Sequence, residues 1–547
     1  MLIAYIKPIF QKALALTNVQ SNVPLIFESP KNSENGDLST NIAMRLAKEL
    51  KQQPRSIAEH LISLLEYDNE LISKVEIAGT GFINIYFTEK FFINALNTII
   101  QSGDQYGRSK AGKGLKVNVE YVSVNPTGLL HLGHGRNAVI GDTVANLFEW
   151  TGHEVTREYY FNNAGNQMNN LAKSIYARYR QIMGDQDYPF PEDGYHGEYI
   201  KEIAQELYEI NADSLSDENE DNLIQCRKFG ENWCFGKIKA TLERMKIHQE
   251  VYYNEDSLYS SGKIESVIND LRSRGWVYEK DGALWLALSQ FGLKDDRVIV
   301  KSSGEPTYRL PDIAYHREKF LRGFDILVDV FGADHIATVP DVLAAIAALG
   351  FDKDKVKVLI HQFVTLTENG EQVKMSKRTG KSYTLDELLD EVGADVVRFF
   401  LLMRGISTHL EFDLSLAREQ SDKNPVFYLQ YAHARISSVF DTARERGINY
   451  ETNPDISILS HITEFNLIKS IIQFPKIISL AKDKCEPMIL ADYLRSLAAD
   501  FHFFYHECRI IGSESALMHA RLQLALTTKI VIKNGLTILG ISAPERM

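Results

Sequence analysis

Residues 116–161 read KVNVEYVSVNPTGLLHLGHGRNAVIGDTVANLFEWTGHEVTREYYF, and this segment carries the pattern from which the fold is predicted. Lys116–Val124 is rich in Val and Tyr, which is typical of a buried strand, and a Pro-Thr-Gly turn follows it. The next residues predict a helix with one apolar face, closed by Gly152, and then a second strand over Glu154–Phe161. Such a strand–helix–strand unit predicts a parallel sheet whose ligand lies at the carboxyl ends of the strands.

Two histidines flank a glycine at the point where the first strand gives way to the helix. They are His131 and His134, on either side of Gly133. A glycine lets a ligand approach the backbone, and a helix N-terminus offers N–H groups and a partial positive charge. Two imidazoles there can donate hydrogen bonds to phosphate oxygens. The alternative is a pair of ordinary surface or capping histidines.

A second short signature lies about 240 residues further on and reads KMSKRTG from Lys374 to Gly380. Two ammonium groups three residues apart, in a loop with glycines on both sides, can close on a triphosphate and release pyrophosphate. A solvated charged loop is the alternative. Neither signature contains an acid–base pair, so together they predict nucleotidyl transfer, in which catalysis is mainly positioning and charge stabilisation.

Composition restricts the class of protein. A chain of 547 residues is too long for one core, so three or four domains are expected. The net charge of −12 argues against non-specific coating of nucleic acid. The four cysteines form no C-x-x-C pair, which makes a zinc or disulfide framework improbable and favours a reducing cytoplasm. No apolar run reaches transmembrane length, and residues 1–16 do not resemble a signal peptide.

The rest of the chain predicts additional units around this core. Residues 1–110 read as a small α/β unit, residues 195–270 as an acidic helical insertion, and the part after Leu414 as helices alone. Strand–helix alternation between residues 283 and 389 predicts the second half of a doubly wound sheet. Its expected strands are Val298–Lys301, Ile326–Val330 and Val356–His361.

With these motifs in view, the chain resembles a class I aminoacyl-tRNA synthetase, and specifically an arginyl-tRNA synthetase, over essentially its whole length. Further matching segments are Gly36–Asn41, Gly81–Asn84, Tyr308–His316, Gly332–His335, Gln430–Arg435 and Ser542–Met547. The resemblance implies a multidomain α/β protein with a Rossmann-type parallel-sheet catalytic core. It places a tRNA-contacting domain at 1–110, the catalytic domain with its helical insertion at 111–413, and an α-helical anticodon-binding bundle at 414–547.

The resemblance also implies the reaction and its participants. L-arginine would react with ATP to give arginyl-adenylate and pyrophosphate, and a terminal hydroxyl of tRNA(Arg) would then take the arginine and release AMP. Mg²⁺ would accompany ATP, no metal would be bound by the protein itself, and the enzyme would be a cytoplasmic monomer without membrane contact.

Site residues follow from the same resemblance. The catalytic residues would be His131, His134, Lys374 and Lys377. The ATP-binding residues would be Asn125, Thr127, Gly128, His131, Gly133, His134, Met375, Ser376 and Lys377. The arginine-binding residues would be Glu120, Asn125, Tyr308 and Asp312, because carboxylates placed for forked hydrogen bonds recognise a guanidinium best. The alternatives are that Glu120 is an ion-pair partner and that Asp312 caps the following helix.

Two positions depart from the family pattern, since Thr80 stands where Pro is usual and Asn163 where Asp is commoner. The nearest alternative is another class I synthetase, such as a glutamyl or cysteinyl enzyme. A glutamyl enzyme would need cationic residues to hold the side-chain carboxylate of its substrate, and a cysteinyl enzyme would be expected to show zinc ligands. A tRNA-binding paralogue without catalysis is the rival from another class, and it would be expected to have lost a signature or a terminal domain.

Overall fold

The computed structural model describes residues 1–17, 23–30, 32–373, 383–450 and 454–547. Its centre is a five-stranded, fully parallel sheet in the order β11-β10-β4-β5-β6. The strands are β4 (Lys116–Glu120), β5 (Glu154–Phe161), β6 (Val251–Asn254), β10 (Ile326–Gly332) and β11 (Val356–His361). The strand order reverses between β4 and β10, the point at which ligands bind in open sheets of this kind. The predicted Rossmann-type core is confirmed.

Burial on both faces explains the apolar composition of the central strands. Val117, Val119, Leu327 and Val328 are fully buried, as expected for parallel strands covered by helices. Helix α5 (Leu132–Trp150) connects β4 to β5 and begins at the carboxyl edge of the sheet. The prediction of β5 and β11 was correct to the residue.

The first strand is shorter than predicted. It ends at Glu120 because Val122 and Ser123 take left-handed backbone conformations, with φ of 69° and 47°. The amide of Val122 donates to the side-chain oxygen of Asn137 (2.6 Å). A β-branched residue such as Val122 is strained in the left-handed conformation. The hydrogen bond to Asn137 helps to hold it there.

Two other sequence predictions were wrong. The segment Val298–Lys301 does not belong to the parallel sheet, because β9 (Arg297–Val300) pairs antiparallel with β8 (Ala283–Leu286), which pairs with β7 (Val277–Lys280). The stretch 195–270 is not helical throughout, because β6 within it forms the edge of the central sheet beside β5.

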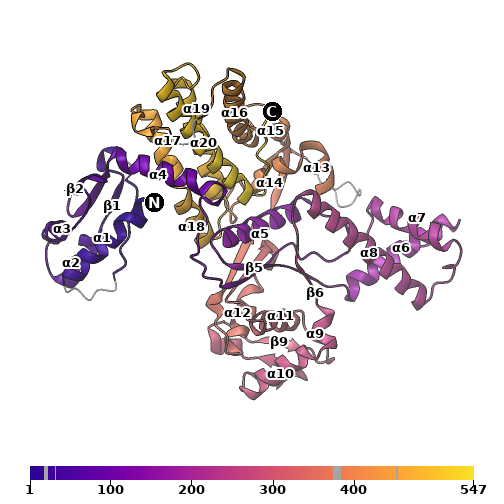
Figure 1. Ribbon diagram of the computed structural model, residues 1–547. Coiled ribbons are helices and arrows are strands. Elements are labelled where there is room, and N and C mark those ends of the chain that lie inside the picture. Colours follow the sequence, from indigo (N-terminus) through magenta and orange to yellow (C-terminus); the bar gives the residue numbers. More distant parts are fainter. Residues whose placement is uncertain (18–22, 31, 374–382, 451–453) are drawn as a thin grey trace.

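The inserted helices form a module with its own apolar core (Figure 1). They are α6 (Gly165–Ile182), α7 (Glu198–Asn211) and α8 (Glu220–Arg244), and they project to the right in Figure 1. The chain then passes through β6 into α9 (Asp256–Ser260) and α10 (Lys263–Ser273).

Other elements complete the catalytic part. The helices are α11 (Arg309–Leu321), α12 (Val339–Ala348), α13 (Leu385–Val392) and α14 (Ala394–Leu402). A small sheet in the order β13-β12-β14 contains β12 (Val364–Glu368), β13 (Glu371–Gln372) and β14 (Leu410–Asp413). The short 3-10 helices are η1 (Ser33–Asn35), η2 (Gly103–Gln105), η3 (Leu288–Phe291), η4 (Ala333–His335), η5 (Lys353–Lys355) and η6 (Ile456–Ile458).

The two ends of the chain form an α/β unit and a helical bundle, as predicted. The N-terminal unit contains α1 (Leu2–Leu16), β1 (Leu38–Thr40), α2 (Ile42–Leu50), α3 (Pro54–Ser63), β2 (Ile72–Ala78), β3 (Phe82–Phe87) and α4 (Glu89–Ser102). The bundle contains α16 (Pro425–Glu445), α17 (Ile462–Ile472), α18 (Phe474–Lys484), α19 (Met488–Glu507) and α20 (Ser515–Ile538), whereas α15 (Leu414–Arg418) packs against β12, β14, α13 and α14. Within the described ranges, no helix is both long and apolar enough to cross a membrane.

The N-terminal unit packs on the bundle, although they are far apart in sequence (Figure 1). Lys533 pairs with Asp104 (3.0 Å), Asn534 donates to the carbonyl of Tyr106 (3.0 Å), and Lys469 pairs with Asp37 (2.7 Å). One apolar cluster runs through both ends of the chain and the central sheet. The three parts therefore share a core.

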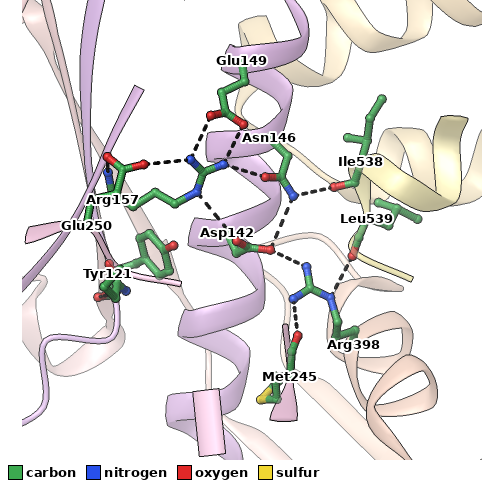
Figure 2. Close-up of polar contacts among 11 residues, drawn as sticks. Tyr121, Asp142, Asn146, Glu149, Arg157, Met245, Glu250, Arg398, Ile538 and Leu539 are labelled. Carbon is green, nitrogen blue, oxygen red and sulfur yellow. Dashed lines mark hydrogen bonds and ion pairs between the residues drawn. The ribbon is translucent and has the colours of Figure 1, made fainter. Parts of the chain in front are cut away.

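A buried ion network joins α5 to the bundle (Figure 2). Arg398 on α14 is fully buried, and its guanidinium donates to the Asp142 carboxylate (2.5 Å), to Leu539 O (2.9 Å) and to Met245 O (2.8 Å). Asn146 of α5 donates to Ile538 O (3.0 Å). This network ties the middle of α5 to the end of α20.

Candidate active site

The two histidines of the first signature form a reciprocal cap at the start of α5. The His131 Nδ1 accepts from the amides of Gly133 (3.1 Å) and His134 (3.4 Å), while the His134 Nδ1 accepts from the His131 amide (3.3 Å). Their rings stack with centroids 3.5 Å apart. An Nδ1 that accepts a hydrogen bond places the proton of a neutral ring on Nε2. Both rings therefore carry an Nε2–H donor.

His134 is neutral at physiological pH. Burial, together with the nearby rings of His131 and His361, lowers the pKa of His134 to about 3. A neutral ring can donate to a phosphate oxygen without first releasing a counter-ion, and the N-terminus of α5 adds its partial positive charge.

The loop before these histidines is held from three sides. Asn125 donates to the Gln167 side chain (2.9 Å) and accepts from the amide of Asn162 (3.0 Å). The Tyr199 hydroxyl of α7 donates to the carbonyl of Thr127 (2.8 Å). Behind the loop, the Tyr159 hydroxyl donates to Val124 O (2.6 Å). Residues 125–134 are thereby fixed at the carboxyl end of β4.

A further contact to this loop comes from the chain that follows the second signature. Lys374, Met375, Ser376 and Lys377 lie outside the described residues. The chain that follows them lies beside the histidines, because Thr384 forms a β-bridge with His131 and the Leu385 amide donates to Leu130 O (2.9 Å). Two motifs about 240 residues apart in sequence thus have neighbouring flanks.

The residues expected to bind arginine gather at the same edge of the sheet but differ in environment. Glu120, at the end of β4, is buried and accepts from Lys319 (2.5 Å) and from Ser123 (3.1 Å). Tyr308 precedes α11 and is 61% exposed. Asp312 is in the first turn of α11, and the residue at the N-cap is Tyr308, without a side-chain capping bond. Asp312 therefore does not cap the helix, whereas Glu120 does have an ion-pair partner.

Lys319 neutralises two of the buried acids beneath this edge. Its ammonium contacts Glu120 (2.5 Å) and Asp329 (2.6 Å), and His316 contacts Asp329 from the other side (3.0 Å). Arg322 forms a fork with Glu158 (2.7 Å to each oxygen). Glu120, Asp329 and Glu158 are therefore each paired with a cationic side chain.

Two further acids have no such cation. Asp312 and Glu255 form no ion pair within the described part of the chain; Glu255 accepts only from Tyr160 (2.7 Å) and Asn162 (2.8 Å). Burial raises the pKa of Asp312 to about 7. The charges of Glu120 and Glu255 add to this effect, and those of His316 and Lys319 only partly oppose it. Burial likewise raises the pKa of Glu255. A cationic ligand would restore the balance of charge here.

Three residues of the site were not predicted from the sequence: Glu255, Lys319 and Tyr199. Glu255 directly follows β6, and a polar residue after a core strand would have been a signal had β6 been recognised. Lys319 shares α11 with Asp312, but nothing local indicates that it is buried. Tyr199 comes from the inserted module, whose position depends on long-range packing.

The two departures from the family pattern occupy different surroundings. The Asn163 amide donates to Glu231 on α8 (2.8 Å), where an aspartate would face a second carboxylate. Thr80 lies in the exposed turn between β2 and β3. Among the described residues, no hydrogen bond or ion pair joins either of them to His134 or Asp312.

Three family descriptions match this chain. Residues 95–398 match "tRNA synthetases class I (R), catalytic domain", residues 4–87 match "Arginyl tRNA synthetase N terminal domain", and residues 429–547 match "DALR anticodon binding domain". Among similar proteins, arginine–tRNA ligase of Salinibacter ruber is 50% identical over 97% of this chain and 98% of its own length. The Bacillus licheniformis ligase is 45% identical, with 96% and 95% covered.

Solved structures show the same fold. The arginyl-tRNA synthetase of Thermus thermophilus superimposes with a TM-score of 0.78 at 22% identity, covering 100% of both chains. The enzyme of Plasmodium falciparum gives 0.74 at 19% identity, covering 100% of this chain and 99% of its own.

Proposed function

Since this chain belongs to the arginyl-tRNA synthetases and is an ATP-dependent arginine–tRNA ligase of class I, we propose which of its residues carry the reaction. The reaction attaches L-arginine to tRNA(Arg) through arginyl-adenylate and releases AMP and pyrophosphate. The observation that supports the site assignment is the pair of carboxylates without cations, Asp312 and Glu255, at the sheet edge where α5 begins.

In the first step, a carboxylate oxygen of arginine attacks the α-phosphorus of ATP, and the bond from that phosphorus to the bridging oxygen breaks. His131 and His134 donate from Nε2 to the phosphate oxygens as negative charge accumulates, and Gly133 keeps the backbone accessible. Asn125, Thr127 and Gly128 line the approach of the nucleotide. No general base is needed because the nucleophile is already ionised.

The second signature is proposed to complete the phosphate site, and this proposal rests on the sequence alone. Lys374 and Lys377 would hold the departing pyrophosphate, with Met375 and Ser376 between them against the nucleotide. Mg²⁺ would enter bound to the ATP phosphates.

Arginine is proposed to place its guanidinium against Asp312, with Glu120 held in position by Lys319 and Tyr308 at the exposed rim. Asn125 would take the backbone end of the amino acid. A guanidinium brings one permanent positive charge and planar donors, which match two carboxylates without cations.

The assignment of roles to domains is also a proposal. Residues 1–110 would contact tRNA away from its anticodon, residues 111–413 would hold the catalytic site, and residues 414–547 would read the anticodon. In the second step, a hydroxyl of the terminal adenosine attacks the activated carbonyl and AMP departs. A cytoplasmic monomer is proposed from the family, and light scattering of the purified enzyme tests the monomer.

Replacing His134 by Ala is expected to lower the rate of arginine- and tRNA-dependent ATP–pyrophosphate exchange by about 10- to 100-fold, which corresponds to the loss of one hydrogen bond to a charged group. The KM for arginine is expected to change little. The exposed His506→Ala variant is the matched control. Exchange within twofold of wild type in His134→Ala would remove this histidine from the mechanism.

Arginine binding is expected to weaken as the pH falls below about 7. The guanidinium favours ionised Asp312, so its pKa is lower in the complex than in the free enzyme, where it is about 7. Below that pH, binding must release a proton, and affinity falls by up to about tenfold per pH unit. Titration calorimetry between about pH 6 and about pH 8 measures the affinity and the released proton. A flat profile for the wild type, equal to that of Asp312→Asn, would contradict this linkage.

A further inference from the structure

The inserted helical module contacts both sides of the phosphate site. At one end, Tyr199 of α7 reaches the loop before His131. At the other end, α8 reaches the start of α13, where Thr241 donates to Asp386 (2.6 Å) and Arg244 pairs with the same carboxylate (2.6 Å). Helix α13 follows the second signature, so the module lies against the flanks of both motifs (Figure 1).

The contact of Tyr199 is made by a single atom. Its hydroxyl donates to the carbonyl of Thr127 (2.8 Å), and no other hydrogen bond of this hydroxyl is recorded among the described residues. Its ring stacks on Trp233 of α8, with centroids 6.3 Å apart, and the Trp233 indole donates to Glu206 of α7 (3.0 Å). The helices of the module therefore orient the ring, and the hydroxyl acts on the loop.

The loop is shaped to receive this hydroxyl. A methyl group on Gly128 would lie 3.1 Å from the Tyr199 oxygen and 3.4 Å from the adjacent ring carbon. Gly128 takes no left-handed backbone conformation, so the restriction on its side chain comes from Tyr199 and not from φ. A side chain at residue 128 would therefore press on the Tyr199 hydroxyl and displace it by a few tenths of an ångström.

We propose that Tyr199 is a positioning residue for adenylate formation: through Thr127 and Gly128 it holds the loop that precedes His131 in the geometry that receives ATP. The inserted module is then part of the catalytic apparatus. This inference rests on the proposed assignment of residues 125–134 to the nucleotide.

Tyr199→Phe tests the proposal because it removes only the hydroxyl and leaves the ring on Trp233. In arginine- and tRNA-dependent ATP–pyrophosphate exchange, kcat/KM for ATP is expected to fall by about three- to tenfold, which corresponds to one neutral hydrogen bond. The KM for arginine and the melting temperature are expected to stay at the wild-type values. The matched control is Tyr188→Phe, which removes a hydroxyl bound to Glu218 (2.6 Å) elsewhere in the module.

A double substitution distinguishes positioning of the loop by Tyr199 from a general loss of activity. Gly128→Ala should reduce kcat/KM for ATP in the wild type and reduce it less in Tyr199→Phe, because the oxygen that its methyl meets is gone. Equal losses in both backgrounds, wild-type kinetics in Tyr199→Phe, or an equal loss in Tyr188→Phe would overturn the proposal. His134→Ala is measured beside them: if it too keeps wild-type exchange, the assignment of the loop to ATP fails, whereas a loss in His134→Ala alone rejects only the role of Tyr199.

Discussion

The Asp312→Asn enzyme is expected to have a steeply raised KM for arginine and an almost unchanged KM for ATP. The substitution keeps the size of the side chain but removes the charge opposite a guanidinium that is always cationic. Losing one partner of a buried charged pair costs about 2–5 kcal/mol, so kcat/KM for arginine should fall by about 30- to several thousand-fold. Steady-state exchange kinetics with varied arginine measure this loss.

Citrulline shows whether Asp312 recognises the charge of the guanidinium or has only a structural role. It is nearly isosteric with arginine but neutral, so the preference for arginine over citrulline should shrink in Asp312→Asn. Asp325→Asn is the matched control, because Asp325 accepts from the Lys116 amide (2.9 Å) at the opposite edge of the same sheet. If the ratio of kcat/KM values is unchanged in Asp312→Asn, the guanidinium is read elsewhere, and Glu120 and Glu255 are the next carboxylates to test.

The second large effect is expected at Arg398, which lies outside the active site. Arg398→Met should lower the free energy of unfolding by about 3–5 kcal/mol, because it leaves the buried Asp142 carboxylate without its closest cation. It also removes the donors to Leu539 O and Met245 O. Thermal unfolding gives the loss, and amide hydrogen exchange should locate it in α5 and at the end of α20 (Figure 2).

Two controls accompany this variant. Lys12→Met breaks the exposed pair of Lys12 with Glu66 (2.5 Å), which should cost less than about 1 kcal/mol. Adding Asp142→Leu to Arg398→Met should recover part of the stability, since removing both members of a buried pair is milder than removing one. If the double variant loses the sum of the two single losses, the two residues are not coupled.

Sequence determined the elements whose signal is local. Strands β5 and β11 were predicted to the residue, because each carries a run of six to eight residues rich in β-branched, aromatic or other apolar side chains. The two signatures and the chemistry of phosphate stabilisation were also readable, since a helix N-terminus with His and Gly has the same meaning in any fold. Family membership followed from these motifs together.

Tertiary structure decided the elements that depend on a distant partner. Strands β6 and β9 have four residues each, too few to show a recognisable alternation of apolar and polar residues. Their pairing with β5 and β8, respectively, determines which sheet each belongs to. The turn at Val122 opposes the preference of a β-branched residue and exists because Asn137 holds its amide.

The electrostatics of the site were likewise decided by the fold. Residues 120, 255 and 312 are far apart in sequence. Folding buries Asp312, which raises its pKa to about 7, and brings the charges of Glu120 and Glu255 close enough to add to that effect. The sequence could name Glu120 and Asp312 as acids, but it could not show that Lys319 forms an ion pair with Glu120 and that Asp312 has no ion pair among the described residues. A residue type is local information, whereas its charge state depends on burial and on neighbours that folding brings together.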